Sequence, residues 1–549
     1  MSNGDNFQIQ INKAAELLRN GNFEAAEREL VALVEMSADP EQSLNALLEF
    51  YMQNQRPLEA MNTLKKLHAE KPDSLFYLDR LAGMLTGFGQ LGIAISYYQD
   101  FVGRHAGNAD AWFNLALLYK RGKRFSDALE AYEKSLTLGV RGAEEVYSNL
   151  GVLYSEMRQA DKAHSMYEQA LQIDPQYIPA LFNLAGLSEE RGDRATAARL
   201  YEKILTLDSQ HLESLSRLAY MKKIGEEDKD LLDKLETASN RDTADPIGKE
   251  SIFFALGKSY DDLAQYDRAV EAYTKGNELG SARNPPYVTA DVETGFHNLK
   301  KVFSKNRIRD ADGDPSVSPI FICGMFRSGS TLIEQILSAH NSIIAAGELD
   351  FLQWLVTQNF TPYPDRVATS TAEELHAVGY QYLSLLESLF PKAWNITDKQ
   401  PDNFLFLGLI KMLYPSARII YTKRNPLDNC LSVFFQQLGG NLHYATRMEN
   451  IAHYYQQHLV LMEHWHECFA DNIFTVDYEN LVNEPEPLLS GLLDFLELEW
   501  DPACLNFSES ANPVKTASVW QVREGLHQNS CGRWKNYRDM IEDISQLLR

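Results

Sequence analysis

The segment between Pro319 and His340 has the residue types of a site that binds an anion. A short apolar run, Ile320 to Cys323, is suited to a buried strand, and Thr331 to Leu337 repeats apolar residues at helical spacing. A loop of small polar residues joins the two. Backbone N–H groups in such a loop and in the first helical turn point at one anion, and the helix dipole adds partial positive charge. We therefore expect a phosphate-binding loop, the alternative being an ordinary strand-to-helix turn.

The spacing of the glycines narrows the choice of anion. Gly324 and Gly329 are separated by four residues and followed by Ser330 and Thr331, which is the frame of a P-loop with serine where the lysine belongs. A nucleoside triphosphatase needs that lysine on the β- and γ-phosphates. Arg327 supplies a cation within the loop, so the sequence favours another phosphate-bearing group over ATP or GTP.

Polar side chains also follow other strand-like runs, where ligands bind in open α/β sheets. Arg424 comes directly after the run Ala417 to Lys423, and Ser432 lies two helical turns further on. Both are placed to reach a second phosphate of one ligand. A surface pair between Arg424 and Asp428 is the alternative.

Glu348 and Lys399 are the candidates for proton transfer. Each follows a segment with strand character. An acid and a lysine in one pocket are suited to taking a proton from an acceptor and neutralising charge on a leaving group. The sequence alone does not show that these two side chains meet. The alternative is that both lie solvated on the surface.

The segments that carry these residues alternate between strand and helix patterns, as in an α/β domain with a parallel sheet. The start signal Asn425-Pro426-Leu427-Asp428 predicts a helix up to Gly439. A further helix is expected at 371–389. The expected strands are 320–323, 342–346, 395–398, 417–423 and 473–476.

The chain before this domain repeats itself. Tyr98, Tyr132, Tyr167 and Tyr201 are separated by 34, 35 and 34 residues, which is the tetratricopeptide period. We therefore expect an N-terminal α-solenoid over residues 1–310 and a P-loop-like α/β domain over residues 319–549. A charged stretch at about 224–250 interrupts the array, 252–279 resembles one more repeat, and 287–303 is expected to close the solenoid with a polar end.

Composition limits the partners and the compartment. The 52 basic and 76 acidic residues give a net charge of −24, which disfavours nucleic acid and anionic lipid. Neither a membrane-spanning run nor a signal peptide is recognisable, so we expect a cytoplasmic protein with no membrane insertion.

Metal binding is not expected. The five cysteines, Cys323, Cys430, Cys468, Cys504 and Cys531, are scattered without a paired CxxC spacing. His453 and His458 lie in a histidine-rich helical segment, but they are five residues apart rather than the four of a helical metal pair.

Taken in order, these motifs resemble the PAPS-dependent sulfotransferases. The matching residues are Phe326 to Leu332 (FRSGSTL), Gly347-Glu348, Asp398-Lys399, and Arg424 to Asp428 (RNPLD) with Ser432. The resemblance covers Pro319 to about Tyr537. Within the family the chain is similar to the tyrosylprotein sulfotransferases, in a bacterial form with tetratricopeptide repeats in front.

The resemblance implies a role for each motif. The loop would hold the 5′-phosphosulfate of PAPS, and Arg424 with Ser432 would hold its 3′-phosphate. Glu348 would be the general base, and Lys399 would stabilise the bridging oxygen as the sulfuryl group leaves. The loop residues with this implied role are Arg327, Ser328, Gly329, Ser330, Thr331 and Leu332.

The C-terminal part also matches the family. The segments Ser518 to Arg523 and Gly532 to Trp534 resemble the part of the family that closes over the donor. Ser518 is the matching catalytic-site serine, and Arg523 and Arg533 are implied donor-binding residues, with arginine at 533 where the tyrosylprotein enzymes have lysine. Tyr478 matches a tyrosine that lines the nucleotide.

Three departures from the family matter. Gln436 stands where those relatives carry a second arginine, which leaves less charge for the 3′-phosphate. The chain shows no membrane anchor, and it carries a long repeat array. The last two differences weaken the inference of a protein-tyrosine acceptor.

The sequence therefore predicts an enzyme that moves a sulfuryl group from PAPS to a hydroxyl. A protein or peptide tyrosine, a glycan, a lipid and a small metabolite all remain open as acceptor. The repeat groove is expected to bind a protein or peptide partner. The alternatives are a P-loop kinase of small molecules, and a repeat scaffold with an inactive nucleotide-binding domain.

Overall fold

The computed structural model describes residues 3–37, 40–314, 319–391, 395–438, 442–509, 514–515, 519–523, 525–546 and 548, without the side chains of 3–6, 509 and 543. Its internal contacts divide the chain into two compact units, Met1–Ala180 (unit 1) and Leu181–Arg549 (unit 2). The predicted domain boundary between residues 310 and 319 stays a prediction, because the division by contacts falls inside the repeats.

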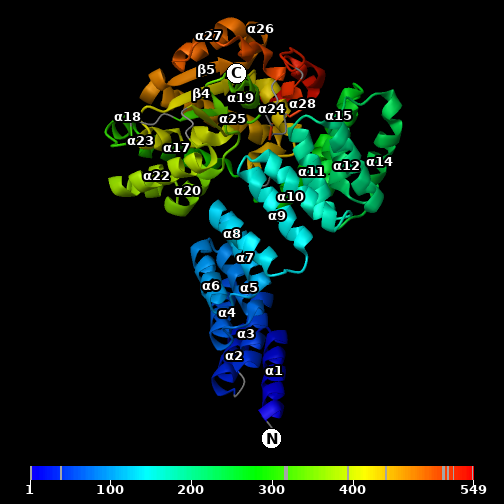
Figure 1. Cartoon of the computed structure of the whole chain (residues 1–549), viewed down its shortest axis with the longest axis vertical. Helices are drawn as coiled ribbons and strands as arrows, with labels where there is room; N and C mark the ends of the chain where they lie inside the picture. Colours follow the sequence, from blue (N-terminus) through cyan, green and yellow to red (C-terminus); the bar gives the residue numbers. More distant parts are fainter. Residues whose placement is uncertain are drawn as a thin grey trace. The chain divides into compact units, whose positions relative to one another are not determined.

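Unit 1 is a run of helical hairpins (Figure 1, blue to cyan). Tyr98, Tyr132 and Tyr167 lie in the second helices of three successive hairpins, and all three are buried. The constant spacing thus repeats one packing arrangement along the solenoid, as predicted. The helices are α1 Asn3–Arg19, α2 Phe23–Met36, α3 Pro40–Gln53, α4 Pro57–Glu70, α5 Leu75–Gly87, α6 Leu91–Arg104, α7 Ala109–Arg121, α8 Phe125–Thr137, α9 Ala143–Glu156 and α10 Ala160–Ile173.

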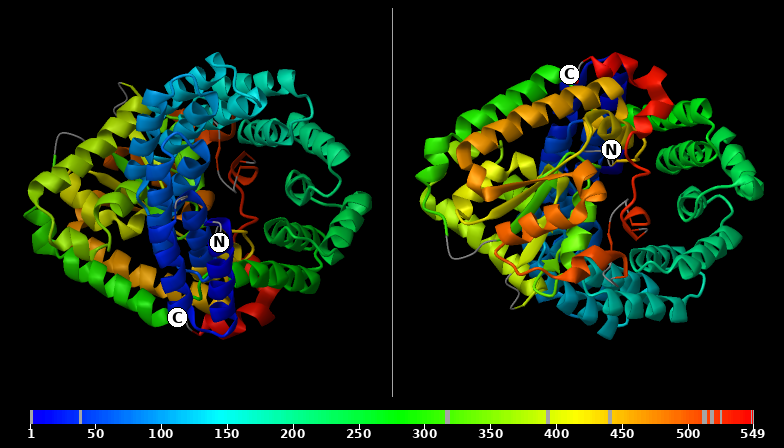
Figure 2. Two further views of the ribbon diagram at one scale, coloured as in Figure 1. Left: turned by 90° about the horizontal axis from the view of Figure 1, so that it is seen from below. Right: turned by 90° about the horizontal axis from the view of Figure 1, so that it is seen from above.

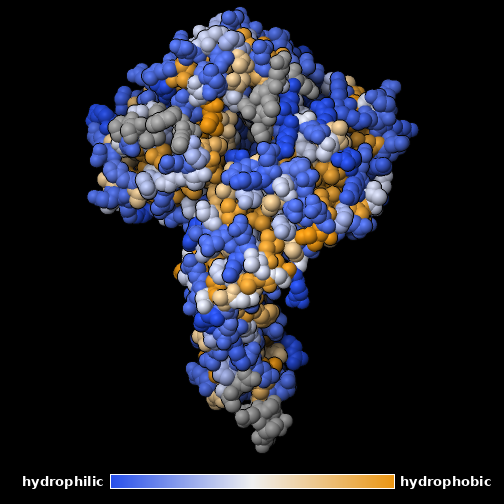
Figure 3. All heavy atoms as spheres, in the orientation of Figure 1, coloured by the Kyte–Doolittle hydropathy of each residue, from blue (hydrophilic) through white to orange (hydrophobic). Residues whose placement is uncertain are grey.

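Unit 1 also exposes apolar side chains. Hydrophobic residues surface at several places along its helices on the face seen in Figure 3. Large side chains such as Met36 and Phe76 are more than half exposed. Exposed apolar surface on repeat helices is typical of sites that bind partners.

The same helical pattern continues into unit 2. Tyr201 and Tyr273 are buried in the second helices of two more hairpins. The helices are α11 Ile178–Glu190, α12 Arg194–Leu207, α13 Leu212–Tyr220, η1 Glu226–Asp228, α14 Lys229–Asn240, α15 Pro246–Asp262, α16 Tyr266–Arg283, α17 Thr289–Val302 and α18 Lys305–Arg309.

Two helices of this part bear on the sequence predictions. The charged stretch after Ile224 contains α14, which buries Leu235 and Ala238 and so packs as an ordinary amphipathic helix. The expected polar end at 287–303 is wrong. Its helix α17 buries apolar residues, and the Phe296 ring lies 5.5 Å from that of Tyr454 in the α/β part.

The α/β part holds a five-stranded parallel sheet in the order β2-β3-β1-β4-β5. All five predicted strands are present within a few residues of their predicted bounds. Every residue of β1 is buried, because the strand is central and helices cover both faces. The strands are β1 Ile320–Gly324, β2 Ile344–Ala345, β3 Ile396–Lys399, β4 Arg418–Lys423 and β5 Ile473–Asp477. The predicted fold class, a solenoid followed by a parallel α/β domain, is confirmed.

The helix after β4 begins as predicted but is shorter. The Asn425 side chain accepts hydrogen bonds from the backbone N–H groups of Leu427 and Asp428, and α24 ends at Phe434. The chain then turns so that the Phe435 ring stacks on Tyr273 at 4.0 Å between ring centres. The predicted end, Gly439, lies outside the described residues.

Further helices surround the sheet. They are α19 Ser330–Ser338, α20 Phe351–Asn359, α21 Asp365–Ala368, α22 Ala372–Leu389, η2 Pro401–Leu405, α23 Leu407–Leu413, α24 Pro426–Phe434, η3 His443–Thr446, α25 Met448–Phe469, η4 Ala470–Asn472, α26 Tyr478–Asn483, α27 Pro485–Phe495, η5 Pro502–Glu509, η6 Gln521–Arg523, η7 Arg533–Tyr537 and α28 Arg538–Ser545.

One hydrophobic core joins the later repeats to the α/β part. It combines residues of α13 to α16 with residues of α24, α25 and α28. A second core lies between the sheet and α19, α26 and α27. In both views of Figure 2 the repeat helices of unit 2 form an arc, and the C-terminal segment lies on its inner side. The later repeats are therefore built into the same folded body as the sheet.

Candidate active site

Two glycines shape the loop after β1. Gly324 has φ +153°, and a Cβ atom added there would lie 2.3 Å from the backbone oxygen of Thr422. Gly329 has φ +104°, and its added Cβ would lie 2.8 Å from the Tyr478 ring. A side chain at either position would therefore push the loop away from its neighbours. Arg327 also has a positive φ, 69°, the kind of backbone strain that is concentrated at functional sites.

Two arginines converge on this loop. The Arg424 guanidinium follows β4, donates through Nη1 to the backbone oxygen of Arg327 at 3.2 Å, and lies 4.9 Å from the centre of the Tyr478 ring. Its buried Nε has no hydrogen-bond partner in the described part of the chain. Burial, and then the charges of Arg424 and Arg533, lower the pKa of Arg327 to about 10. Cations gathered in this way favour an anion between them.

The serines near the loop have different surroundings. The Ser432 hydroxyl accepts a hydrogen bond from Nε of Arg327 at 3.1 Å. Ser328 is buried, its hydroxyl lies 2.7 Å from that of Thr422, and its backbone N–H donates to Met325. Ser328 therefore stabilises the conformation of the loop through buried contacts and does not face the cleft beside it.

The loop borders a small cleft of about 170 Å³, here called the loop cleft. Most of the predicted donor residues meet in it. Sequence reasoning missed Gln521 and Ser530, which accept hydrogen bonds from Arg327 and Arg424 respectively. The predicted residues that line the loop cleft are Arg327, Gly329, Ser330, Thr331, Leu332, Glu348, Arg424, Ser432, Tyr478 and Arg533.

Glu348 and Lys399 form an ion pair beside the loop cleft. The Nζ of Lys399 lies 2.5 Å from Oε1 of Glu348. The lysine side chain is 0% exposed, whereas the glutamate side chain is 36% exposed. Strand β3 ends at Lys399, whose backbone N–H donates to Gly347 at 3.1 Å. The pair thus places a solvent-accessible carboxylate over a buried cation at the carboxyl ends of the strands.

Buried acids hold these strand ends in place. The Glu334 carboxylate accepts from the backbone N–H of Gly347 at 3.0 Å and from the Thr397 hydroxyl at 2.9 Å. Asp398 accepts from the Tyr382 hydroxyl at 2.7 Å, and burial raises its pKa to about 7. Sequence reasoning did not single out Glu334, although an acid within an otherwise apolar helix segment is a usable signal.

The C-terminal strap, meaning the described residues between 514 and 537, closes one side of the loop cleft. Asp428 is buried and accepts from the backbone N–H groups of Gly532 at 2.6 Å and Trp534 at 2.9 Å. The alternative in which Asp428 pairs with Arg424 is therefore not what the structure shows. Asp428 anchors the strap to the start of α24.

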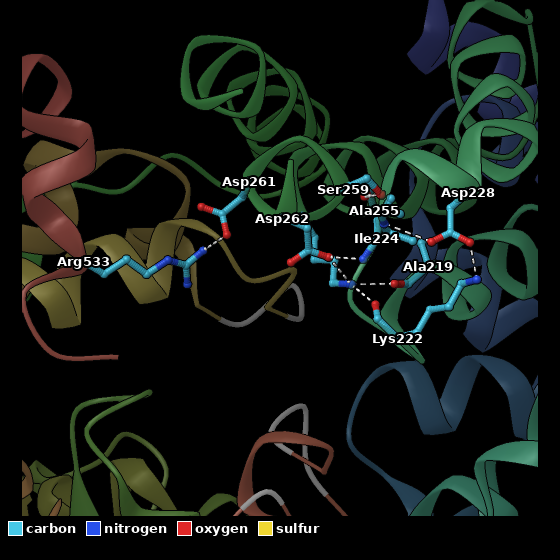
Figure 4. Close-up of polar contacts among 11 residues, drawn as sticks. Ala219, Lys222, Ile224, Asp228, Ala255, Ser259, Asp261, Asp262 and Arg533 are labelled. Atoms are coloured by element: carbon cyan, nitrogen blue, oxygen red, sulfur yellow. Dashed lines mark hydrogen bonds and ion pairs between the residues drawn. The ribbon is translucent and has the colours of Figure 1, made fainter. Parts of the chain in front are cut away.

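The strap is also attached to the repeats. Figure 4 shows Arg533 reaching Asp261 at the end of α15, and their ion pair measures 2.5 Å. The Tyr537 hydroxyl donates to the same carboxylate. Burial lowers the pKa of Arg533, but Asp261 and the neighbouring tyrosine hydroxyls together raise it above its usual value. A predicted donor-binding residue is thus held by a repeat helix.

The remaining predicted residues lie elsewhere. Arg523 does not line the loop cleft: its guanidinium donates to the backbone oxygen of Glu190 at 2.7 Å, at the turn after α11. Gln436 lines a different cavity. Ser518 lies outside the described residues.

A larger cavity of about 890 Å³, here called the repeat-side cavity, adjoins the loop cleft. The two share five residues, Arg327, Glu348, Ser432, Gln521 and Arg533. Helices α11 to α13, α15 and α16 supply most of the other lining residues. Glu348 and Arg327 line both spaces.

Two further properties of the described residues concern metal binding and the membrane. Within the described residues, no group of His, Cys, Asp and Glu is arranged to hold a metal ion. None of the described helices has both the length and the apolar character needed to cross a bilayer.

A parallel sheet with a glycine loop, converging arginines and an acid–lysine pair at its strand ends defines an α/β domain suited to group transfer. Residues 319–502 match the model of the sulfotransferase family. Residues 87–140, 154–218 and 250–279 match tetratricopeptide-repeat models. The chain therefore combines a region that matches the sulfotransferase family with regions that match tetratricopeptide repeats, the combination that the sequence predicted.

Individual proteins are similar to parts of the chain. A protein of Aquifex aeolicus is 32% identical over 332 residues, which cover 57% of this chain and 43% of that protein. The protein-tyrosine sulfotransferase of Drosophila melanogaster is 24% identical over 266 residues, covering 46% of this chain and 50% of the relative. The chain thus spans about half the length or less of these relatives. The sulfotransferase domain of the Synechococcus PCC 7002 olefin synthase has 18% identity and a TM-score of 0.33 over 43% of this chain and 94% of that domain.

Proposed function

We propose that unit 2 is a sulfotransferase that moves a sulfuryl group from PAPS to a hydroxyl acceptor. The observation that carries the proposal is the meeting of Arg327, Arg424 and Arg533 at a glycine loop whose P-loop lysine position holds Ser330. These cations suit a ligand with several separate anionic groups. The match of 319–502 to the sulfotransferase family supports the same reading.

The donor residues fit PAPS in charge and position. The backbone at the start of α19, with Arg327, would hold the 5′-phosphosulfate. Arg424 and Ser432 would hold the 3′-phosphate, and the unpartnered Nε of Arg424 is a donor available to it. The Tyr478 ring, beneath Arg424, would pack against the nucleotide.

The strap would have to shift for the donor to enter. The loop cleft of about 170 Å³ is smaller than the roughly 300–1,000 Å³ of most ligand pockets. The side-chain oxygen of Gln521 and the backbone oxygen of Ser530 accept hydrogen bonds from Arg327 and Arg424. In the proposal, phosphate oxygens of the donor replace these two acceptors.

Glu348 and Lys399 would perform the transfer. The Glu348 carboxylate takes the proton of the acceptor hydroxyl as that oxygen bonds to sulfur. The bond from sulfur to the bridging oxygen breaks, and adenosine 3′,5′-bisphosphate leaves. Lys399 Nζ neutralises the charge that develops on that oxygen. Their ion pair, 2.5 Å long, fixes both groups before substrate binds.

The acceptor is proposed to be a protein or peptide tyrosine. Relatives named protein-tyrosine sulfotransferases support this choice. The repeats provide the kind of surface that binds polypeptides.

Calorimetry with adenosine 3′,5′-bisphosphate tests the donor site. We expect saturable binding, and binding of ADP at least about tenfold weaker because ADP lacks the 3′-phosphate. Radiolabelled PAPS should then pass its label to a small phenol such as para-nitrophenol. Absence of binding, or equal binding of ADP with magnesium-dependent phosphate release, would contradict the proposal.

Adjacent residues of β4 and its loop provide a matched pair of variants. Arg424→Ala should weaken binding of adenosine 3′,5′-bisphosphate by about a hundredfold, because a charged bidentate contact is lost. Lys423→Ala is the control, since Lys423 lies outside the loop cleft and is ion-paired with Asp477 at 3.6 Å. The control should bind as the wild-type protein does.

A further inference from the structure

The repeat-side cavity opens onto the proposed base from the repeats. Glu348 and Arg327 line it from the α/β part, and helices α11 to α13, α15 and α16 line it from the repeats. Its volume of about 890 Å³ is near the upper end of the range for ligand pockets. It is therefore large enough for an acceptor much bigger than a phenol.

The lining of this cavity is strongly charged. Eight lysine and arginine residues and five aspartate and glutamate residues line it. Among them, Arg217 lies 3.0 Å from Glu189 and Lys258 lies 2.6 Å from Asp262. A lining of this kind disfavours a lipid acceptor, because burying an acyl chain against charges costs free energy.

Three of the aromatic rings that line the cavity already have a cation or another ring packed against them. The Arg194 guanidinium lies 4.4 Å from the centre of the Trp520 ring. Phe435 stacks on Tyr273, and Arg533 lies 5.4 Å from its ring centre. Open aromatic faces for stacking on sugar rings are thus not offered by these residues, whereas charged and polar groups suit the backbone and side chains of a polypeptide.

We propose that the repeat-side cavity is the acceptor site, and that it binds an extended polypeptide segment whose hydroxyl reaches Glu348 from the repeats. The inference rests on the proposed sulfotransferase function. It assigns helices α11 to α13, α15 and α16 a direct part in substrate binding, beyond that of a module attached to the enzyme.

A glycine pair gives a matched test of this site. Gly186 in α11 lines the cavity, and a Cβ atom added there meets nothing within 4 Å. Gly83 occupies the same position in α5 of unit 1, does not line the cavity, and also leaves open space for a Cβ. Gly186→Phe should therefore fill the cavity without disturbing the helix backbone, and Gly83→Phe is its control.

A charge variant gives a second test that does not depend on cavity filling. Glu189→Gln with Arg217→Gln neutralises a pair that also includes the Tyr201 hydroxyl. Glu236→Gln with Arg268→Gln neutralises the corresponding arrangement at Tyr260, outside the cavity. Replacing both partners together avoids leaving one charge buried alone.

The assay compares three acceptors with radiolabelled PAPS as donor. They are a random-sequence peptide pool with central tyrosine, serine or threonine, an oligosaccharide pool, and para-nitrophenol. For Gly186→Phe and for the Glu189/Arg217 variant, we expect the ratio of kcat/KM for peptide to that for phenol to fall by about tenfold or more. Both controls should keep the wild-type ratio within about twofold, and all four variants should keep their affinity for adenosine 3′,5′-bisphosphate.

The contrary outcomes separate the two proposals. Label in oligosaccharide but not in peptide, or equal losses in the variants and their controls, would overturn the acceptor site while leaving the sulfotransferase proposal standing. Failure of the wild-type protein to bind adenosine 3′,5′-bisphosphate and to label any acceptor would overturn both.

Discussion

The site in unit 2 has two walls that are built in different ways: an α/β wall, formed by the strand ends and the glycine loop, and a repeat wall, formed by the repeat helices. On the α/β wall, functional groups stand at strand ends and are fixed by backbone geometry and buried acids, as Glu334 fixes Gly347 beside Glu348. On the repeat wall, side chains on helix surfaces are held by ion pairs such as that of Asp261 with Arg533. A strand end and a glycine loop set atoms to the accuracy that bond making needs. Ion pairs between helix side chains position a ligand, and they are easier to change by substitution than a strand end or a glycine loop is.

The repeats of the two units share their internal packing but differ in what they contact. Buried tyrosines at matching positions, such as Tyr132 in α8 and Tyr273 in α16, give both sets of helices the same packing. In unit 2, however, Tyr273 also stacks on Phe435 of the α/β part, and the Asn277 side chain donates to the backbone of Phe434 at 2.9 Å. One repeat pattern thus forms a solenoid in unit 1 and, in unit 2, packs into the same body as the sheet.

Truncations at two points should show most clearly that the repeats of unit 2 are needed for folding and that those of unit 1 are not. A chain that starts at Ala311 loses the repeat part of the shared hydrophobic core, so it should fail to fold and bind no adenosine 3′,5′-bisphosphate. A chain that starts at Asp174 keeps all of α11 and should bind within about threefold of the full chain. Calorimetry and thermal unfolding measure both, and equal behaviour of the two truncations would contradict the distinction.

Glu348→Gln should produce the largest loss from a single substitution on the α/β wall. Without a base at this position, single-turnover transfer from PAPS to para-cresol, a phenol that stays protonated at neutral pH as tyrosine does, should slow by about a thousandfold. Binding of adenosine 3′,5′-bisphosphate should persist, because the cations of the loop cleft are unchanged. Glu374→Gln, which neutralises a surface glutamate paired with Arg366 at 2.6 Å, is the control and should transfer normally. A similar rate in the two variants would exclude Glu348 as the base.

Sequence reasoning found the α/β wall because its signals are local. The apolar runs 320–323 and 417–423 predict strands, and a glycine loop or a charged residue at a strand end has a known place in an open sheet. The motif order then placed Arg327, Glu348 and Arg424 near one another, and the structure brings all three to the loop cleft.

The repeat wall carried no comparable signal. Asp261 is an ordinary acid on an amphipathic helix, and its partner Arg533 lies far along the chain. Such a contact depends on how the repeats curve, which a tyrosine period does not specify. For the same reason α17 was expected at a polar end, although its residue Phe296 packs on Tyr454.

Asp398→Asn should remove a pH dependence that belongs to the α/β wall. Burial raises the pKa of Asp398 from 3.8 to about 7, so its contribution to stability is fully present below about pH 3.8 and is lost as the pH rises to about 7. The free energy of unfolding of the wild-type protein should therefore fall, relative to that of the variant, by at most about 4 kcal/mol over this range. Urea unfolding at pH 5 and pH 8 measures the part of this change that lies above pH 5, at most about 3 kcal/mol.

Comparing the wild-type protein with Asp398→Asn cancels the pH dependence that comes from other titrating groups. His458 acts in the opposite direction, since burial lowers its pKa to about 3 and stability is lost as the pH falls below 6.5. That contribution is common to both proteins and cancels in the difference. Parallel pH curves for wild type and variant would show that Asp398 is not the buried titrating group.

Asp261→Asn should have the smallest effect and should act on binding, because it belongs to the repeat wall. The substitution removes the charge that orients Arg533, while Arg533 keeps its place beside Phe435. We expect the affinity for adenosine 3′,5′-bisphosphate to fall by about tenfold, with little change in single-turnover transfer at saturating PAPS. Asp267→Asn, at an exposed position in the first turn of α16, is the control and should change neither quantity. Tighter binding in Asp261→Asn would instead mean that Asp261 competes with the donor for Arg533, and the repeat wall would then oppose donor binding.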